Sequence, residues 1–305
     1  MKTEWTTANI PSQAGRRILI TGANSGIGWE AALELARRGA EIILPARTEA
    51  KANDAIARIR AQVPNAKLIP EILDLADLSS VHAFARRVAE MFPGQSLDLL
   101  INNAGVMAVP TRELTVDGYE RQFATNYLGP FALTALLFWS IKPQQGSRIV
   151  TLASGVTNTA KLEFDNLQSQ RRYSPMFQAY SQSKLADLIF QQELQRRLTA
   201  TGSPILSTGA HPGYAITNLQ VTGPGENMPF ILRLGTMILK PLASQDAAHG
   251  ALPRSSRPPR PKPLPEATTA PTASRNSKAT QSPQRSRRPP KTQPSPNASG
   301  QKPNA

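Results

Sequence analysis

The chain of 305 residues contains no cysteine. This absence excludes disulfides, thiolate catalysis and cysteine-based zinc sites, and it fits a reducing compartment. Long apolar runs are also missing, because the longest one, residues 131–139, is far shorter than the ~20 residues that cross a bilayer. The first residues lack the apolar segment of a signal peptide. We therefore expect a cytoplasmic protein without a membrane span, and we predict no metal site.

Acidic residues are almost absent from residues 254–305. This segment carries 11 Lys and Arg against the single acid Glu266, so it holds most of the net charge of +14. It is rich in Arg, Pro, Ser and Thr and has no aromatic residue, so it cannot bury a core. We expect residues 1–253 to form the folded domain and residues 254–305 a disordered basic tail. Its charge could bind an anionic membrane or nucleic acid, but the high pI is no evidence of nucleic-acid binding by the folded part.

The folded part begins with a strand, a glycine turn, a helix and a second strand. Residues 17–21 read as a buried strand, and the turn that follows contains Gly22, Gly26 and Gly28. Residues 29–38 have helical apolar spacing, and residues 41–44 form the second strand. This order predicts a doubly wound, Rossmann-type parallel sheet in a three-layer α/β/α fold. The glycines would let the backbone approach a pyrophosphate at the helix N-terminus.

The residue after the second strand bears on the choice of cofactor. An NAD site places an acidic residue there to bind the ribose hydroxyls, but this chain has Arg47. An arginine can pair with a 2′-phosphate, so we predict NADP(H) rather than NAD(H). The alternative is a solvated arginine without a ligand.

The pattern of alternating elements continues along the chain. We predict helices at residues 51–62, 78–92, 118–137 and 180–198, and strands at residues 67–72, 97–101, 148–152 and 205–208. Residues 102–105, Asn-Asn-Ala-Gly, follow a predicted strand, and small and amide residues there suit close approach to a ligand.

Tyr180 and Lys184 lie four residues apart on a predicted helix and therefore share one face. A phenol alone has a pKa near ~10, so it is a poor proton shuttle at neutral pH. A fixed ammonium one turn away favours the phenolate. The pair therefore predicts an acid/base that exchanges a proton with a substrate oxygen.

Five motifs occur together in order, at residues 21–28, 46–47, 102–105, 126–129 and 165–173. Over about residues 5–253 the chain resembles the short-chain dehydrogenase/reductase family, and within it the retinol-dehydrogenase-like branch. The resemblance implies a hydride transfer between a nicotinamide cofactor and a carbonyl or alcohol. We expect a lipophilic alcohol, aldehyde or ketone as substrate. Its binding pocket would be lined by residues 106–114, 155–179 and 214–240. The family is usually oligomeric, so a homo-oligomer is a further expectation.

The resemblance also implies roles for single residues. Tyr180 is the acid/base, Lys184 favours its phenolate and holds the nicotinamide ribose, and Ser154 hydrogen-bonds the reacting oxygen. Asn126 holds a water that links Lys184 to solvent, and Asp74 contacts the adenine side. The remaining implied cofactor contacts are Gly22, Asn24, Ser25, Gly26, Ile27, Gly28, Arg47, Leu75, Asn103, Ala104, Gly105, Pro212, Gly213 and Thr217.

Each of these residues also has a structural interpretation. Ser154 could cap a turn, Asn126 could be a buried amide bonded to the backbone, and Asp74 or Thr217 could be a helix N-cap. Two other functions are alternatives for the whole chain. One is a regulator that binds NADP(H) without turnover, and the other is membrane or nucleic-acid association through the basic tail.

Residues 254–305 have a second interpretation, as a translation out of frame. When residues 266–281 are reverse-translated and read across codon boundaries, the permitted products include G-Y-Y-G-P-D-G-F-A-E-L-K-G-Y-P. This string resembles the C-terminal segment of the same family branch, which completes the last strand of the sheet. We therefore expect the last strand to be lost, with lower stability and weaker substrate binding. An early stop codon in the shifted frame of the gene would exclude this hypothesis.

Overall fold

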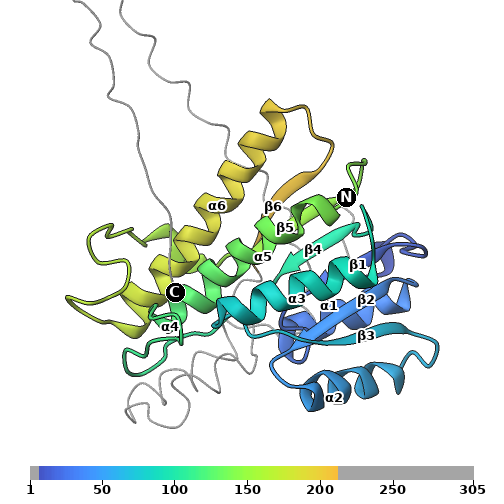
Figure 1. Cartoon of the computed structure of the whole chain (residues 1–305), viewed down its shortest axis with the longest axis horizontal. Helices are drawn as coiled ribbons and strands as arrows, with labels where there is room; N and C mark the ends of the chain where they lie inside the picture. Colours follow the sequence, from blue (N-terminus) through green and yellow to red (C-terminus); the bar gives the residue numbers. More distant parts are fainter. Residues whose placement is uncertain (1–6, 212–305) are drawn as a thin grey trace, which may run out of the picture. The chain divides into compact units, whose positions relative to one another are not determined.

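The structure is a computed structural model that describes residues 7–211. Within these residues, six parallel strands form one sheet in the order β3-β2-β1-β4-β5-β6 (Figure 1). The order of the strands along the chain reverses between β1 and β4, the position where doubly wound sheets bind their ligands. The predicted Rossmann-type sheet is thereby confirmed. The strands are β1 (Arg17–Ile20), β2 (Glu41–Ala46), β3 (Lys67–Ile72), β4 (Leu99–Asn102), β5 (Arg148–Leu152) and β6 (Leu206–Ala210).

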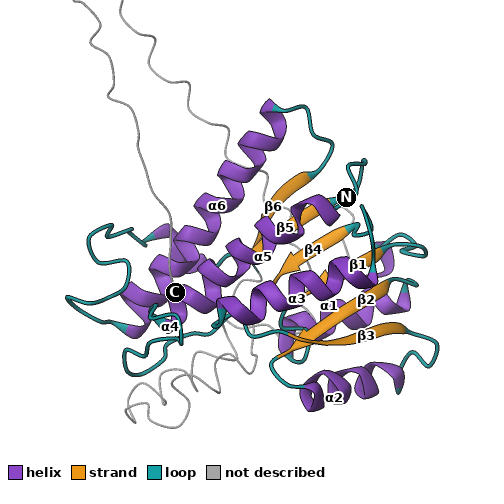
Figure 2. Cartoon of the chain, in the orientation of Figure 1, coloured by secondary structure: helices purple, strands orange, loops and turns teal. Residues whose placement is uncertain are grey.

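Helices connect the strands and cover the sheet (Figure 2). The main helices are α1 (Gly26–Arg37), α2 (Glu49–Arg60), α3 (Leu78–Met91), α5 (Gly129–Leu137) and α6 (Ser181–Ala200). Two π-helical segments, η2 (Ala124–Leu128) and η5 (Pro175–Tyr180), lie directly before α5 and α6. The shorter elements are η1 (Thr7–Asn9), α4 (Arg121–Phe123), η3 (Phe138–Ser140) and η4 (Gly155–Asn158). Of these described helices, none is both long and apolar enough to span a membrane.

The side chains of the strands alternate between two hydrophobic cores, as the pleat of a strand requires. Ile18 and Ile42 pack with α1 and α2 on one face of the sheet. Leu19 and Ile43 pack with α3, α5 and the end of α6 on the other face. Because both faces of these central strands are covered, β1 and β2 are continuous apolar runs, which is the pattern from which they were predicted.

Several predicted boundaries differ from the structure, among them that of the first helix, which begins at Gly26 rather than at residue 29. The second strand does not end at Leu44 but continues through Pro45 to Ala46. Pairing of β2 with β1 ends at Ile43, so the missing N–H of Pro45 interrupts no ladder with β1. The predicted helix at residues 118–137 begins at Arg121, because the carboxylate of Glu120 caps the amides of Gln122 and Phe123.

The expected loss of a last strand and the expected basic tail concern residues that lie outside the described range. The same holds for the predicted contacts of Pro212, Gly213 and Thr217.

Candidate active site

The glycine turn between β1 and α1 has a backbone that requires glycine at two positions. Gly22 and Gly26 have φ of +68° and +57°, in the left-handed region. A Cβ at Gly28 would lie 2.3 Å from Asn103 Nδ2 and 2.5 Å from the carbonyl oxygen of Gly22. Gly28 is therefore required for close packing inside the protein, in addition to its predicted contact with a pyrophosphate.

The first amides of α1, at Gly26, Ile27 and Gly28, follow this turn and have no partner within the helix. Ser25 is the N-cap residue, but its side chain makes no capping hydrogen bond. The carbonyl oxygen of Asn24 accepts a hydrogen bond of 2.6 Å from Arg58 Nη2, which fixes the outer side of the turn. The arrangement leaves backbone donors and the Ser25 hydroxyl for an anionic group such as a phosphate.

Asn103 links the end of β4 to the glycine turn. Its Nδ2 donates to the carbonyl oxygen of Thr21 at 2.8 Å. In return, Thr21 Oγ1 accepts hydrogen bonds from the amides of Asn103 and Ala104, at 3.0 and 3.1 Å. The side chain of Asn103 thus holds the turn in place, and Thr21, to which the sequence assigned no role, is its partner.

Arg47 lies one residue beyond the end of β2, and its side chain is exposed. It makes no ion pair or hydrogen bond with any residue in the described range. Arg58, in contrast, pairs with Asp54 at 3.0 Å and lies over the ring of Trp29. The Arg47 guanidinium is therefore available to an anionic ligand beside the glycine turn.

Asp74 does not cap α3, so that structural interpretation is wrong. The N-cap residue is Asp77, which accepts hydrogen bonds from the amides of Ser79 and Ser80. Hydrogen bonding by the Ser79 side chain holds the pKa of Asp77 below its usual value. Asp74 Oδ1 instead accepts a hydrogen bond of 2.9 Å from the amide of Ala76, two residues further on.

Leu75 packs against the start of α5. A Cβ at Gly129 would lie 2.3 Å from the carbonyl oxygen of Leu75, so only glycine allows this approach. The motif at residues 126–129 therefore combines a buried amide with a packing glycine.

Asn126 lies in the π-helical segment η2 and is 1% exposed. Its Oδ1 accepts a hydrogen bond from the amide of Val106 at 2.7 Å, and its Nδ2 donates to the carbonyl oxygen of Val106 at 2.9 Å. Nδ2 also donates to Ser183 Oγ at 2.9 Å, which joins η2 to α6. The bonds match the alternative in which Asn126 is a buried amide tied to the backbone. Gly105 lies beside it, since a Cβ there would be 3.2 Å from Asn126 Oδ1.

Tyr180 and Lys184 meet at the junction of η5 and α6, and each is 5% exposed. Lys184 Nζ donates to the carbonyl oxygen of Leu152, the last residue of β5, at 2.8 Å. Ser154 follows two residues later, and η4, which begins after Ser154, packs against α6. The structure therefore brings the serine, the tyrosine and the lysine to the carboxyl end of β5.

The side chain of Ser154 makes no capping hydrogen bond, so the alternative in which it caps the following turn does not hold. Its carbonyl oxygen accepts from the amide and the hydroxyl of Thr157. The Ser154 hydroxyl is thus available to a ligand as far as the described residues are concerned.

The charge of Lys184 is stabilised inside the protein. Burial acts to lower the pKa of Lys184, but the Asp187 carboxylate and the Tyr180 phenol outweigh it, so the pKa is raised from its ordinary value. Lys184 Nζ donates to Asp187 Oδ2 at 2.9 Å. Lys184 is therefore an ammonium at neutral pH, as an acid/base pair with Tyr180 requires.

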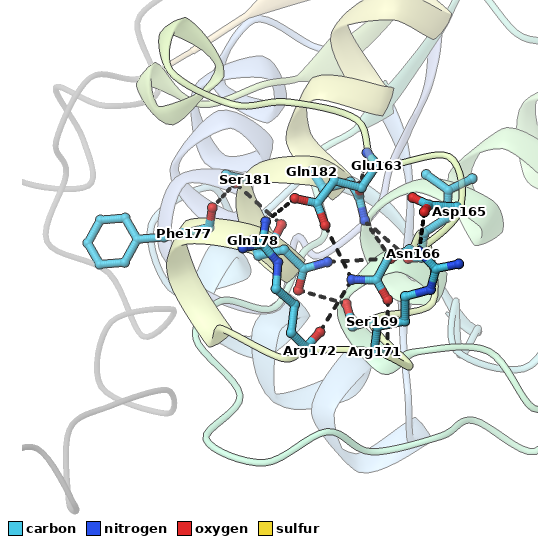
Figure 3. Close-up of polar contacts among 11 residues, drawn as sticks. Glu163, Asp165, Asn166, Ser169, Arg171, Arg172, Phe177, Gln178, Ser181 and Gln182 are labelled. Carbon is cyan, nitrogen blue, oxygen red and sulfur yellow. Dashed lines mark hydrogen bonds and ion pairs between the residues drawn. The ribbon is translucent and has the colours of Figure 1, made fainter.

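The connection between η4 and η5 is held against the start of α6 by buried polar side chains (Figure 3). Gln182 Nε2 donates to the carbonyl oxygen of Leu167 at 3.2 Å, and Gln182 Oε1 accepts from the amide of Glu163 at 2.7 Å. Ser169 Oγ donates to Gln178 Oε1 at 3.0 Å. The sequence predicted a substrate lining at residues 155–179 but not these hydrogen bonds, because their partners are known only once the connection is folded. The network fixes the backbone that leads into Tyr180.

These features define a dinucleotide-binding α/β protein with a buried tyrosine–lysine pair beside the binding edge of the sheet. Residues 16–224 match the short chain dehydrogenase family. Retinol dehydrogenase 12 of Mus musculus is 42% identical over 214 residues, which cover 70% of this chain and 65% of that protein. The chain belongs to the short-chain dehydrogenase family, is similar to this retinol dehydrogenase within it, and spans less than two thirds of that relative's length.

Two solved structures are similar to the chain. A crystal structure of a protein from Mycobacterium paratuberculosis is 47% identical, with a TM-score of 0.61, and the match covers 70% of this chain and 73% of that one. A short-chain dehydrogenase from Burkholderia cenocepacia J2315 in complex with NADP is 26% identical, with a TM-score of 0.59, and the match covers 78% and 88%. The family uses a nicotinamide cofactor, and the described residues fit one, with a glycine turn, open helix amides and an unpaired Arg47 at one edge of the sheet.

Proposed function

We propose that the chain is an NADP(H)-dependent oxidoreductase that acts on a lipophilic alcohol, aldehyde or ketone. The observation that carries the proposal is the buried Tyr180–Lys184 pair, bonded to the carboxyl end of β5. This edge of the sheet also carries the glycine turn that fits a pyrophosphate. The mouse relative is named a retinol dehydrogenase, and retinol is lipophilic, which supports this class of substrate.

The protein residues have separate tasks in this reaction. The nicotinamide, when bound, supplies or accepts the hydride. Tyr180 gives a proton to the substrate oxygen during carbonyl reduction and takes one during alcohol oxidation. Ser154 donates a hydrogen bond to the same oxygen, where negative charge develops in the transition state. Lys184 keeps a positive charge beside the phenol, and its third N–H would hold the cofactor ribose.

The preference for NADP(H) follows from Arg47. We expect Arg47→Ala to raise the KM for NADPH about tenfold, because one charge-assisted bond to the 2′-phosphate contributes about 1.4 kcal/mol at an exposed site. The KM for NADH should change less than twofold, since NADH has no 2′-phosphate. Steady-state rates with each cofactor measure both effects.

The matched control is Arg86→Ala, which removes an exposed arginine that pairs with Glu90 on α3. It should leave both KM values unchanged. Equal effects of Arg47→Ala on NADPH and NADH would contradict the assignment of Arg47 to the phosphate.

The substrate class is tested by NADPH consumption with aldehydes of increasing apolar length, from acetaldehyde to retinal. The proposal predicts a higher kcat/KM for the long apolar aldehydes, because they bury more apolar surface. NADPH that stays unoxidised with every aldehyde and ketone, in a protein that binds it, would favour the regulator instead.

A further inference from the structure

Asp187 is a buried acid that the predicted catalytic set does not include. It lies one turn after Lys184 on α6 and is 1% exposed. Its Oδ2 accepts a hydrogen bond of 2.9 Å from Lys184 Nζ. Its Oδ1 is also buried and accepts no hydrogen bond from a residue in the described part of the chain. Burying a carboxylate with one oxygen that accepts no hydrogen bond costs free energy unless its charge is paired.

The surroundings of Asp187 contain few titratable groups. On its own side of the protein these are Lys184 and, through Lys184, Tyr180 of η5. From η2, Tyr127 faces the same charge, because its pKa is raised by burial and then by the Asp187 carboxylate. The Leu152 carbonyl of β5, which does not titrate, accepts a hydrogen bond from Lys184 and not from Asp187. Burial raises the pKa of Asp187 to about 6, against the opposing effect of Lys184, so the acid is mostly ionised at pH 7.

The geometry gives Asp187 two effects on Lys184. An ammonium has three N–H groups, and the carboxylate and the Leu152 carbonyl occupy two of them. The third N–H has no acceptor among the described residues. In addition, a negative charge in contact with the ammonium cancels part of its field at the phenol, and this cancellation is strong in a buried site.

We propose that Asp187 is a positioning residue that fixes the direction of the Lys184 ammonium and limits the positive charge that acts on Tyr180. The inference rests on the proposed function only for the role of Tyr180 in turnover. Through Lys184, Asp187 sets the pH range in which the Tyr180 phenol exchanges its proton.

The test is Asp187→Asn, which keeps an oxygen that accepts from Lys184 Nζ and removes the charge. Alcohol oxidation requires the phenolate, so its rate rises with pH. The midpoint of this rise should move to lower pH by about one unit in the variant, in which the amide oxygen and the Leu152 carbonyl still accept from the Lys184 ammonium, since a buried charge at this range shifts a titration by one unit or more. Well below pH 6 the two proteins should converge, because the wild-type carboxyl is then neutral like the amide that replaces it.

Glu193→Gln is the matched control, because it makes the same change on an exposed part of α6. Its midpoint should equal that of the wild type. Asp187→Ser gives a second neutral variant in case the Asn variant does not fold. A midpoint that stays in place or moves to higher pH in the folded neutral variants would overturn the proposal.

A second readout separates this inference from the proposed function. The absorbance change of a phenol on ionisation is recorded during a pH titration, and the curve of the matching Tyr180→Phe protein is subtracted to isolate Tyr180. The Asp187 proposal predicts the same downward shift, with or without turnover. A shifted titration in a protein without turnover would support the role of Asp187 and contradict the proposed oxidoreductase activity. Turnover with unshifted curves would support the activity and contradict the role of Asp187.

Discussion

Replacing Tyr180 by phenylalanine is expected to lower kcat by about 10³-fold and to leave the Kd for NADPH within twofold of the wild type. In the proposed reaction the hydroxyl supplies the proton, and a positioned acid/base contributes about 10²–10⁴-fold to a rate. The ring keeps its buried place, because Tyr180 Oη makes no hydrogen bond with a residue in the described range. Steady-state kinetics and the fluorescence of bound NADPH measure the two quantities.

Tyr119→Phe is the control, since it makes the same chemical change at a tyrosine that is 37% exposed. It should leave kcat unchanged. Turnover that persists in Tyr180→Phe would refute the assignment of Tyr180 as the acid/base. A loss of NADPH binding together with turnover would indicate that the site requires the hydroxyl for holding the cofactor, and would contradict its assignment as an acid/base alone.

Gly28→Ala is expected to destabilise the protein by about 2 kcal/mol and to weaken NADPH binding more than tenfold. Alanine normally favours a helix over glycine, by about 1 kcal/mol, so the expected sign is opposite to the helix propensity. The added Cβ would lie 2.3 Å from Asn103 Nδ2 and 2.5 Å from the carbonyl oxygen of Gly22, and overpacking of this kind costs about 1–3 kcal/mol. The turn must then shift, and its amides shift with it.

Thermal unfolding measures the stability, where about 2 kcal/mol corresponds to a Tm lower by roughly 4–8 °C for a protein of this size. Gly155→Ala is the control for Tm, because nothing lies within 4 Å of a Cβ at that position. A Gly28→Ala protein with the Tm and the NADPH Kd of the wild type would show that the turn is not packed as described.

The sheet was predictable because its strands carry their signal locally. The boundaries of β3 and β5 agree with the sequence prediction at both ends. In β1 and β2 a run of buried apolar residues between polar turns is typical of a strand covered on both faces, and no distant contact is needed to recognise it.

The helices around the site were less predictable, because distant contacts shape them. The π-helical turns at η2 and η5 carry Asn126 and Tyr180, and no local pattern distinguishes a π-turn from an α-helix. Asn126 in η2 is bonded to Val106, twenty residues earlier in the chain. The helix start at Arg121 depends on Glu120, a residue type that rarely caps helices.

The pairings of polar residues inside the site were also missed. Asp187 lies three residues after Lys184 in the sequence, and that spacing alone is common on solvated helix faces. Only the burial of both side chains, at 1% and 5% exposed, distinguishes this pair from a surface ion pair. Gln182 lies between Tyr180 and Lys184 in the sequence, but its hydrogen-bond partners belong to the connection between η4 and η5.

The central claim is that a hydride passes between NADP(H) and a lipophilic carbonyl at the Tyr180 site. The direct measurement uses NADPH deuterated at the transferable position of the nicotinamide, with retinal as substrate, and mass spectrometry of the alcohol formed. The account predicts one deuterium on the former carbonyl carbon in the wild type and no labelled alcohol from Tyr180→Phe above background. Alcohol formed without deuterium from either position of the nicotinamide, or no alcohol from a protein that binds NADPH, would contradict it.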